Sequence, residues 1–133
     1  MLAYPVITAL SAGVLIILQI LLMLHTSNGR LKYQKGLGDG GEMQMLIRMR
    51  MHGNLAENAP IFLIVMALLE VAGVNQIILA IAAALFVIAR IVHPIGLMQT
   101  NGRSMFRFFS TIYTMLLGFV GGIYLIITAL GQL

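Results

Sequence analysis

The sequence contains no cysteine and few charged residues, and each shortage excludes a class of protein. Without cysteine the chain forms no disulfide, no thiolate metal site and no cysteine nucleophile, so any thiol chemistry must use a thiol that a ligand supplies. Only 9% of the 133 residues are charged and 60% are hydrophobic, whereas a soluble domain is about 25% charged. The composition therefore predicts a membrane protein, and the length allows a single domain over residues 1–133.

Four apolar segments account for this composition. Each has about the 20 residues that a helix needs to cross the hydrocarbon core of a bilayer, and we expect the spans at residues 3–24, 46–69, 77–97 and 106–130. A cleaved signal peptide is not expected in the first segment, because no basic residue precedes it and no small-residue cleavage motif follows. The predicted fold is an all-α bundle of four transmembrane helices.

The basic residues predict the orientation of these spans. They flank two of the three connections: Arg30, Lys32, Lys35, Arg48 and Arg50 near the first, and Arg103 and Arg107 near the third. The second connection, residues 70–76, and both chain ends carry no lysine or arginine. The positive-inside rule then puts the first and third connections in the cytoplasm and both termini on the non-cytoplasmic side. The same rule explains the net charge of +4, so no nucleic-acid partner is expected.

A glycine-rich segment, residues 36–41, follows the first span. Four glycines in six residues are typical of a phosphate-binding loop, but the Gly-Lys-Ser/Thr ending of a P-loop is absent. We interpret the segment as a turn, with Asp39 or Glu42 near the start of the next helix, where acids interact favourably with the helix dipole. A nucleotide site is the less favoured alternative.

The second span begins with a polar stretch, RMRMHGNLAENAP, residues 48–60. At about 100° per residue, Arg50, Asn54 and Glu57 share one narrow sector of a helix. Glu57 is followed directly by apolar residues, and an ionised group near the bilayer centre costs about 2.5–3.5 kcal/mol unless it faces a bundle interior or a watery cavity. An inward stripe of this kind suits a zwitterionic ligand, with Arg50 on a carboxylate, Asn54 on an amide and Glu57 on an ammonium. The alternative is a buried Arg50–Glu57 pair that only holds helices together.

The fourth span carries a second polar face. Arg103 and Arg107 begin it and share one face with Thr111 and Thr114, and a row of small residues lies on nearly the same side: Ser110, Thr114, Gly118 and Gly122. Rows of small residues let helices approach closely in lipid, so this face is expected to pack against another helix. Arg107 is interpreted as an inward-facing residue, with a snorkelling anchor at the helix end as the alternative.

The third span is interrupted by Arg90 and His93. The chain has three histidines, scattered and without carboxylate partners, and a zinc site needs a closer set of ligands. No metal site is therefore expected.

Four motifs in this order resemble the MAPEG superfamily, the membrane-associated proteins in eicosanoid and glutathione metabolism, in their small bacterial form. They are G-D-G-G (38–41), R-x-H-G-N-x-x-E-x-x-P (50–60), R-x-x-H-x-x-G (90–96) and R-x-x-S-x-x-x-T (107–114). The likeness runs from about residue 30 to the fourth span, and its most specific part is the R-x-x-x-N-x-x-E element.

The resemblance implies a homotrimer in the bacterial inner membrane, with glutathione as co-substrate between neighbouring subunits near the cytoplasmic face. It implies that Arg50, Asn54 and Glu57 hold the glutathione. It assigns to Arg107 the arginine that stabilises the glutathione thiolate, with Arg103, one helical turn earlier, as a rival for that role.

Three further positions follow less closely from the resemblance. Arg30 falls near a basic residue at the end of the family's first span that is implicated in ligand contact. His93 and Leu97 stand where several well-studied members have tyrosine, and His93 is a candidate to replace one of the two phenol donors.

Two classes of function are compared on this basis. The first is a glutathione transferase that acts on hydrophobic electrophiles, with glutathione-dependent peroxidase activity as a related reaction, and a role in detoxification. The second is a non-catalytic membrane protein that binds lipid or glutathione and acts through a partner. The joint presence of Arg50, Asn54, Glu57 and Arg107 favours the enzyme. A transporter is less favoured, because such proteins usually show internal repeats or broken helices.

Overall fold

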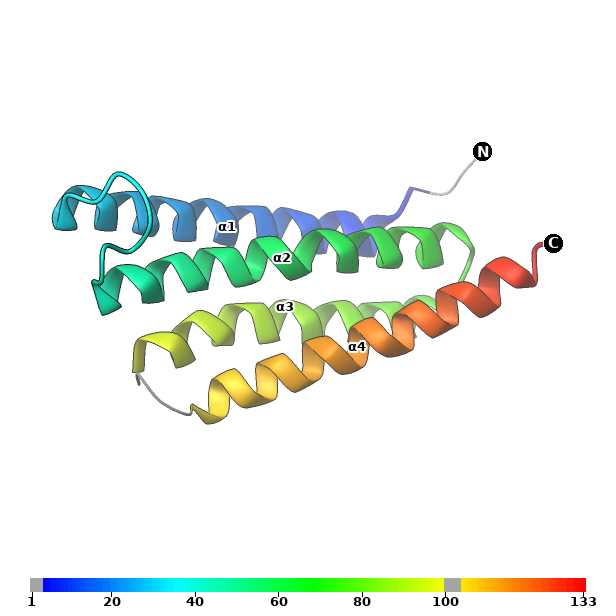
Figure 1. Ribbon diagram of the computed structural model, residues 1–133. Helices are drawn as coiled ribbons and strands as arrows, with labels where there is room; N and C mark the ends of the chain where they lie inside the picture. The colour runs from blue at the N-terminus through cyan, green and yellow to red at the C-terminus, as the bar shows by residue number, and fades with distance from the viewer. Residues whose placement is uncertain (1–3, 100–103) are drawn as a thin grey trace.

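The computed structural model describes residues 4–99 and 104–133 and forms four helices there (Figure 1). They are α1 (Val6–Tyr33), α2 (Met43–Val71), α3 (Gln76–Gln99) and α4 (Met105–Leu130). All four are long and apolar enough to cross a membrane. The predicted all-α fold with four spans is therefore confirmed.

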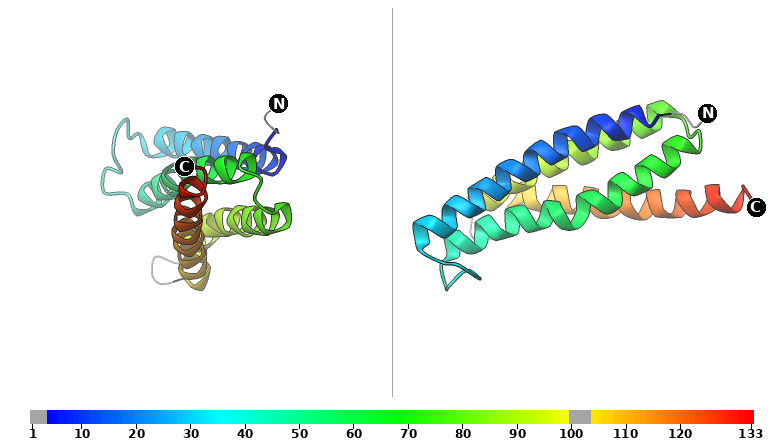
Figure 2. Two further views of the ribbon diagram at one scale, coloured as in Figure 1. Left: turned by 90° about the vertical axis from the view of Figure 1, so that its right-hand side faces the viewer. Right: turned by 90° about the horizontal axis from the view of Figure 1, so that it is seen from above.

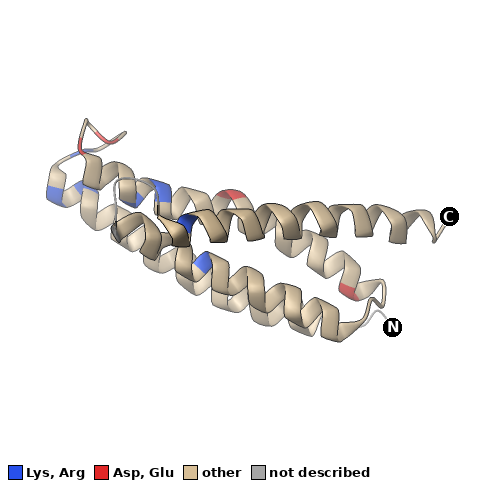
Figure 3. Ribbon diagram, turned by 90° about the horizontal axis from the view of Figure 1, so that it is seen from below, with Lys and Arg blue, Asp and Glu red and all other residues tan. Residues whose placement is uncertain are grey.

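The helices run up and down, so that the two chain ends lie at one end of the bundle and the α1–α2 loop lies at the other (Figure 1). α1 packs against α2 and α3, and α4 packs against the same two helices from another side. α4 stands at the side of the bundle and is inclined to the other helices (Figure 2). The described lysines and arginines lie in the half of the bundle that carries the α1–α2 loop (Figure 3).

The core is formed by apolar side chains of the first three helices. Its centre is a stacked pair of rings, Phe62 of α2 and Phe86 of α3, whose centroids are 3.7 Å apart. The largest apolar side chains of α4 remain exposed, including Phe108, Phe109 and Phe119. Because these side chains are exposed, α4 contributes few of them to the core. Such an apolar surface is unfavourable in water, but a bilayer solvates it.

α1 continues well beyond the predicted end of the first span at residue 24, up to Tyr33. Its polar last turns pack against α2: Thr26 and Gly29 are buried, and the Thr26 hydroxyl lies within hydrogen-bond distance of the carbonyl oxygens of Leu22 and Arg48, at 2.9 and 3.1 Å. The Arg48 guanidinium donates to the His25 carbonyl oxygen at 2.7 Å. A Cβ at Gly29 would lie 2.6 Å from Cδ of Arg48, so glycine allows this close approach.

The glycine-rich segment forms a turn whose backbone wraps around one side chain. Gly38, Gly40 and Gly41 have positive φ values of 64°, 59° and 81°, a left-handed conformation that glycine adopts without steric cost. The guanidinium of Arg30 donates to the carbonyl oxygens of Lys35, Gly36 and Gly38 at 3.3–3.5 Å. The carbonyl oxygens of the loop therefore face the guanidinium of Arg30. This geometry agrees with the interpretation of the segment as a turn.

A buried carboxylate closes the opposite end of the bundle. Glu70, 5% exposed at the end of α2, accepts hydrogen bonds from the backbone N–H groups of Ile7 and Thr8 at 2.8 and 2.9 Å and from the Thr8 hydroxyl at 2.8 Å. The first N–H groups of a helix have no partner within the helix. Glu70 therefore caps α1 from another helix and joins the two.

We predict that Glu70→Ala lowers the free energy of unfolding by about 1–3 kcal/mol, because it leaves buried donors without an acceptor. Thermal unfolding of the detergent-solubilised protein, followed by circular dichroism, measures the effect. Glu42→Ala is the matched control, since Glu42 is exposed and its side chain makes no capping hydrogen bond. Equal melting temperatures for the two variants would contradict the capping role.

Candidate functional site

A cavity of about 650 Å³ lies between α2, α3 and α4, and we call it the basic cavity. Its lining combines two guanidinium groups, an amide, an imidazole and two hydroxyl groups with apolar walls: Arg50, Asn54, His93, Leu97, Ser104, Met105, Arg107, Phe108 and Thr111. No aspartate or glutamate of the described chain lines it. The cavity is therefore suited to an anionic ligand.

Four predicted site residues meet in the basic cavity, although they come from three helices. Arg50 and Asn54 lie one turn apart on α2, His93 lies on α3 and Arg107 lies on α4. Leu97, one turn after His93, contributes an apolar wall. The rival residue Arg103 lies outside the described residues.

Glu57 lies on the outer face of the single chain, whereas the helical spacing led us to expect it in the bundle interior. Its carboxylate is 3.6 Å from the Arg50 guanidinium, and both side chains are 57% exposed. The buried face of α2 is formed by other residues, including Met51, Leu55 and Phe62, so Glu57 lies off the core. Both members of the pair lie on α2, so within the single chain this contact joins no two helices, and the alternative of a pair that holds helices together stays a prediction for an assembly.

Arg30 does not line the basic cavity. Its guanidinium is held by the carbonyl oxygens of the α1–α2 loop, as described above. The structure therefore gives this residue a role in the shape of the loop, and a ligand contact within the single chain has no support.

The α3–α4 contact beside Arg107 depends on a glycine. A Cβ at Gly96 would lie 2.9 Å from Oγ of Ser104 and 3.0 Å from both Cγ and the backbone nitrogen of Arg107. The first distance is shorter than real Cβ contacts, and the other two are tighter than nearly all of them. The absence of a side chain at Gly96 thus brings the half-buried Arg107 close to α3.

His93 is fixed by a hydroxyl group of α4. Its side chain is 7% exposed, and Nδ1 lies 2.9 Å from Oγ of Ser110. The Ser110 hydroxyl in turn donates to the carbonyl oxygen of Arg107 at 3.1 Å. The Ser110 hydroxyl has one proton, so the acceptor that takes it, Nδ1 or the Arg107 carbonyl oxygen, sets the tautomer of His93.

Arg90 is a residue that sequence reasoning did not assign to the site. It is 2% exposed, and its guanidinium donates to the Asn54 side-chain oxygen at 2.6 Å, to the Ser110 carbonyl oxygen at 3.0 Å and to the Thr114 hydroxyl. It also lies over the Phe86 ring, 5.5 Å from the centroid, in a cation–π contact. The available signal was a charge inside the apolar run 77–97, which by itself marks a functional position.

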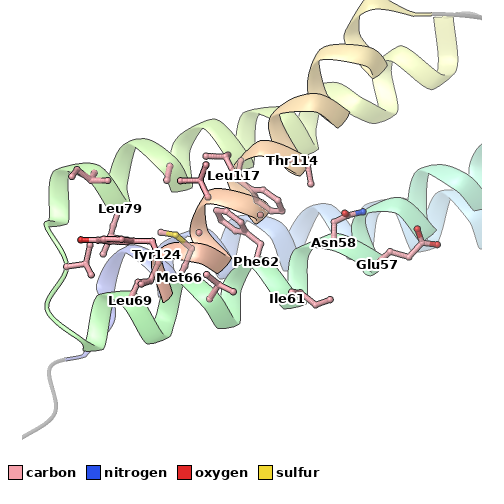
Figure 4. Close-up of a pocket in the computed structure, with 18 residues that line it drawn as sticks. Glu57, Asn58, Ile61, Phe62, Met66, Leu69, Leu79, Thr114, Leu117 and Tyr124 are labelled. Carbon is pink, nitrogen blue, oxygen red and sulfur yellow. The ribbon is translucent and has the colours of Figure 1, made fainter. Parts of the chain in front are cut away.

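A second cavity, of about 220 Å³, lies on the other side of Arg90, and we call it the apolar cavity. Apolar side chains of α2, α3 and α4 line most of it, including Phe62, Met66 and Leu117. Figure 4 shows Glu57 and Asn58 at one end of it and Tyr124 at the other. An elongated apolar molecule with one polar end matches this lining.

Comparisons with known proteins agree with the fold. The model of the MAPEG family matches residues 8–128. The chain is similar to the inner membrane protein YecN of Escherichia coli strain K12, and to the protein of that name in strain O6:H1 (CFT073), with 30% identity over 67 residues in each case. That match covers 50% of this chain and 51% of the relative, so the chain spans about half the length of the curated relatives it matches. No solved structure matches the chain.

Proposed function

This chain belongs to the MAPEG family, and on that premise we propose that it is a glutathione transferase of the membrane. It would bind glutathione, activate the thiol and conjugate it to hydrophobic electrophiles. The observation that carries the proposal is the basic cavity, in which the guanidinium groups of Arg50 and Arg107 meet the Asn54 amide, while Glu57, which pairs with Arg50, does not line it. Glutathione is an anionic peptide with two carboxylates, and guanidinium groups bind carboxylates with charge-assisted hydrogen bonds.

In this proposal Arg107 binds the glutathione sulfur. A nearby guanidinium lowers the pKa of a thiol because it stabilises the thiolate, and the thiolate is the nucleophile. The thiol proton passes to water at the mouth of the cavity. The sulfur then forms a bond to the electrophilic carbon, and the leaving group departs with the electron pair of the bond that breaks.

The electrophile enters from the bilayer in this scheme. The apolar cavity lies between the same three helices as the basic cavity, and Glu57 and Thr114 line its polar end. A hydrophobic substrate held there approaches the thiolate in a fixed position, which replaces a bimolecular encounter by an effectively unimolecular step.

We further propose that neighbouring subunits complete the site in a homotrimer, as the family likeness implies. Arg50 and Glu57 are more than half exposed on the single chain. A Cβ at Gly122 of α4 would meet no atom within 4 Å, so the small-residue row expected to pack has room for another helix at this position. In a bacterial inner membrane, both termini would lie on the non-cytoplasmic side.

The alternative, a membrane protein that binds lipid or glutathione without catalysis, is supported by the apolar cavity alone. A conjugation assay with a generic aryl halide and glutathione separates the two. The proposal predicts product formation that requires the protein and saturates with glutathione. Saturable binding of glutathione without any conjugate would favour the alternative.

For Arg107→Ala, we predict that the fraction of bound glutathione present as thiolate at neutral pH falls about tenfold, equivalent to about one pKa unit. Loss of the cation raises the pKa of the bound thiol, so less thiolate forms at a given pH. Ultraviolet absorbance titration of thiolate on the detergent-solubilised protein measures this. Arg107→Lys keeps the charge and should retain part of the thiolate, and Lys32→Ala removes an exposed cation elsewhere. A normal thiolate yield in Arg107→Ala together with a loss in Arg103→Ala would assign the role to Arg103.

Replacement of Glu57 by glutamine is expected to weaken glutathione binding about tenfold, because the neutral amide no longer attracts the ligand ammonium. Calorimetry gives the affinity, and light scattering after size exclusion shows whether the assembly is retained. Glu42→Gln provides a control at an exposed acid near the start of α2. If Glu57→Gln binds glutathione as tightly as the parent, Glu57 is not a ligand contact.

A further inference from the structure

Arg90 determines which atoms Asn54 offers to a ligand. A guanidinium group has five donors and no acceptor, so the amide atom that faces its Nη1 at 2.6 Å must be the oxygen of Asn54. The two N–H bonds of the amide are then left for the basic cavity, which Asn54 lines. The usual ambiguity between the two ends of an asparagine amide is removed here by the chemistry of its partner.

The orientation is enforced by the burial of Arg90. The guanidinium is 2% exposed, and its acceptors on α2 and α4 are all uncharged: the Asn54 amide oxygen, the Ser110 carbonyl oxygen and the Thr114 hydroxyl. Its Nε is buried and has no hydrogen-bond partner in the described chain. Rotation of the Asn54 amide would place N–H groups against N–H groups and leave a second donor of a buried cation without an acceptor, which is unfavourable.

We infer that Arg90 is a positioning residue that makes Asn54 a pure hydrogen-bond donor, so that this point of the basic cavity selects a carboxylate or carbonyl oxygen of the ligand. The assignment rests on the proposed function for the identity of the ligand. It narrows the role expected from the sequence, in which an asparagine can pair with either side of an amide group. Arg50 and Arg107 line the same cavity, so the oxygen that Asn54 binds shares that cavity with two guanidinium groups, and the ligand ammonium is directed elsewhere.

Asn54→Asp tests this directly, because it keeps the oxygen that Arg90 needs and replaces the N–H₂ group by a second oxygen. The variant should be at least as thermally stable as the parent, since Arg90 gains a carboxylate partner. Its affinity for S-methylglutathione, a ligand without a free thiol, should nevertheless fall at least tenfold, from the loss of one hydrogen bond and the repulsion between anions. Asn28→Asp adds the same charge on an exposed position of α1 and serves as the matched control.

Ligand selectivity supplies the second readout. The parent should prefer S-methylglutathione over at least one of its two monoamides, in which one carboxylate becomes a primary amide. Asn54→Asp should shift that preference at least tenfold toward the amide, which offers N–H groups to the new carboxylate. Unchanged affinity and selectivity in Asn54→Asp would overturn the inference, because a residue that only supports the fold would behave in that way.

Failure of the proposed function gives a different pattern. If the parent binds neither glutathione nor S-methylglutathione, the proposed ligand is wrong, and the role of Arg90 is judged by thermal unfolding alone. Asn54→Ala, which removes the acceptor, should then melt below the parent while Asn54→Asp does not. An Asn54→Ala variant as stable as the parent, or an Asn54→Asp variant less stable than Asn54→Ala, would overturn the inference.

Discussion

A guanidinium buried in an apolar bundle is the constraint on which the described structure depends. Lipid offers no hydrogen bonds, so the donors of such a group depend on acceptors within the protein, and the two terminal nitrogens of Arg90 find them while Nε does not. The acceptors of Arg90 come from α2 and α4, while Arg90 itself is on α3. The hydrogen bonds of this one side chain therefore join three helices at one level along the bundle. The two cavities lie on either side of that level, with Asn54 in the lining of the basic cavity and Thr114 in that of the apolar cavity.

The described arginines fall into two groups by the atoms that surround their guanidinium groups. The first group, Arg30, Arg48 and Arg90, donates to backbone or side-chain oxygens of the chain itself, and these contacts shape the loop, the α1–α2 contact and the centre of the bundle. The second group, Arg50 and Arg107, lines the basic cavity, and Arg50 also lies 3.6 Å from the Glu57 carboxylate. A chain with few charged residues thus uses some of its arginines to hold the fold and still presents positive charge to a ligand.

The fold followed from the sequence because hydrophobic length is a strong signal in a membrane protein. The end of α1 was missed because its polar last turns pack on α2, and the contact between Gly29 and Arg48 is invisible in the order of residues. Helical spacing correctly grouped Arg50 and Glu57, which pair on α2. It could not say which face of α2 is the core, and Glu57 proved to be outside. Arg90 stood out only as a charge, since its partners lie 20 to 36 residues away in sequence.

The most direct measurement is a structure of the protein with glutathione bound, determined by electron microscopy or crystallography. The account predicts that glutathione occupies the basic cavity, with its sulfur within hydrogen-bond distance of the Arg107 guanidinium and one of its oxygens on the amide nitrogen of Asn54. Glutathione density outside this cavity, or an ammonium group facing Asn54, would contradict it.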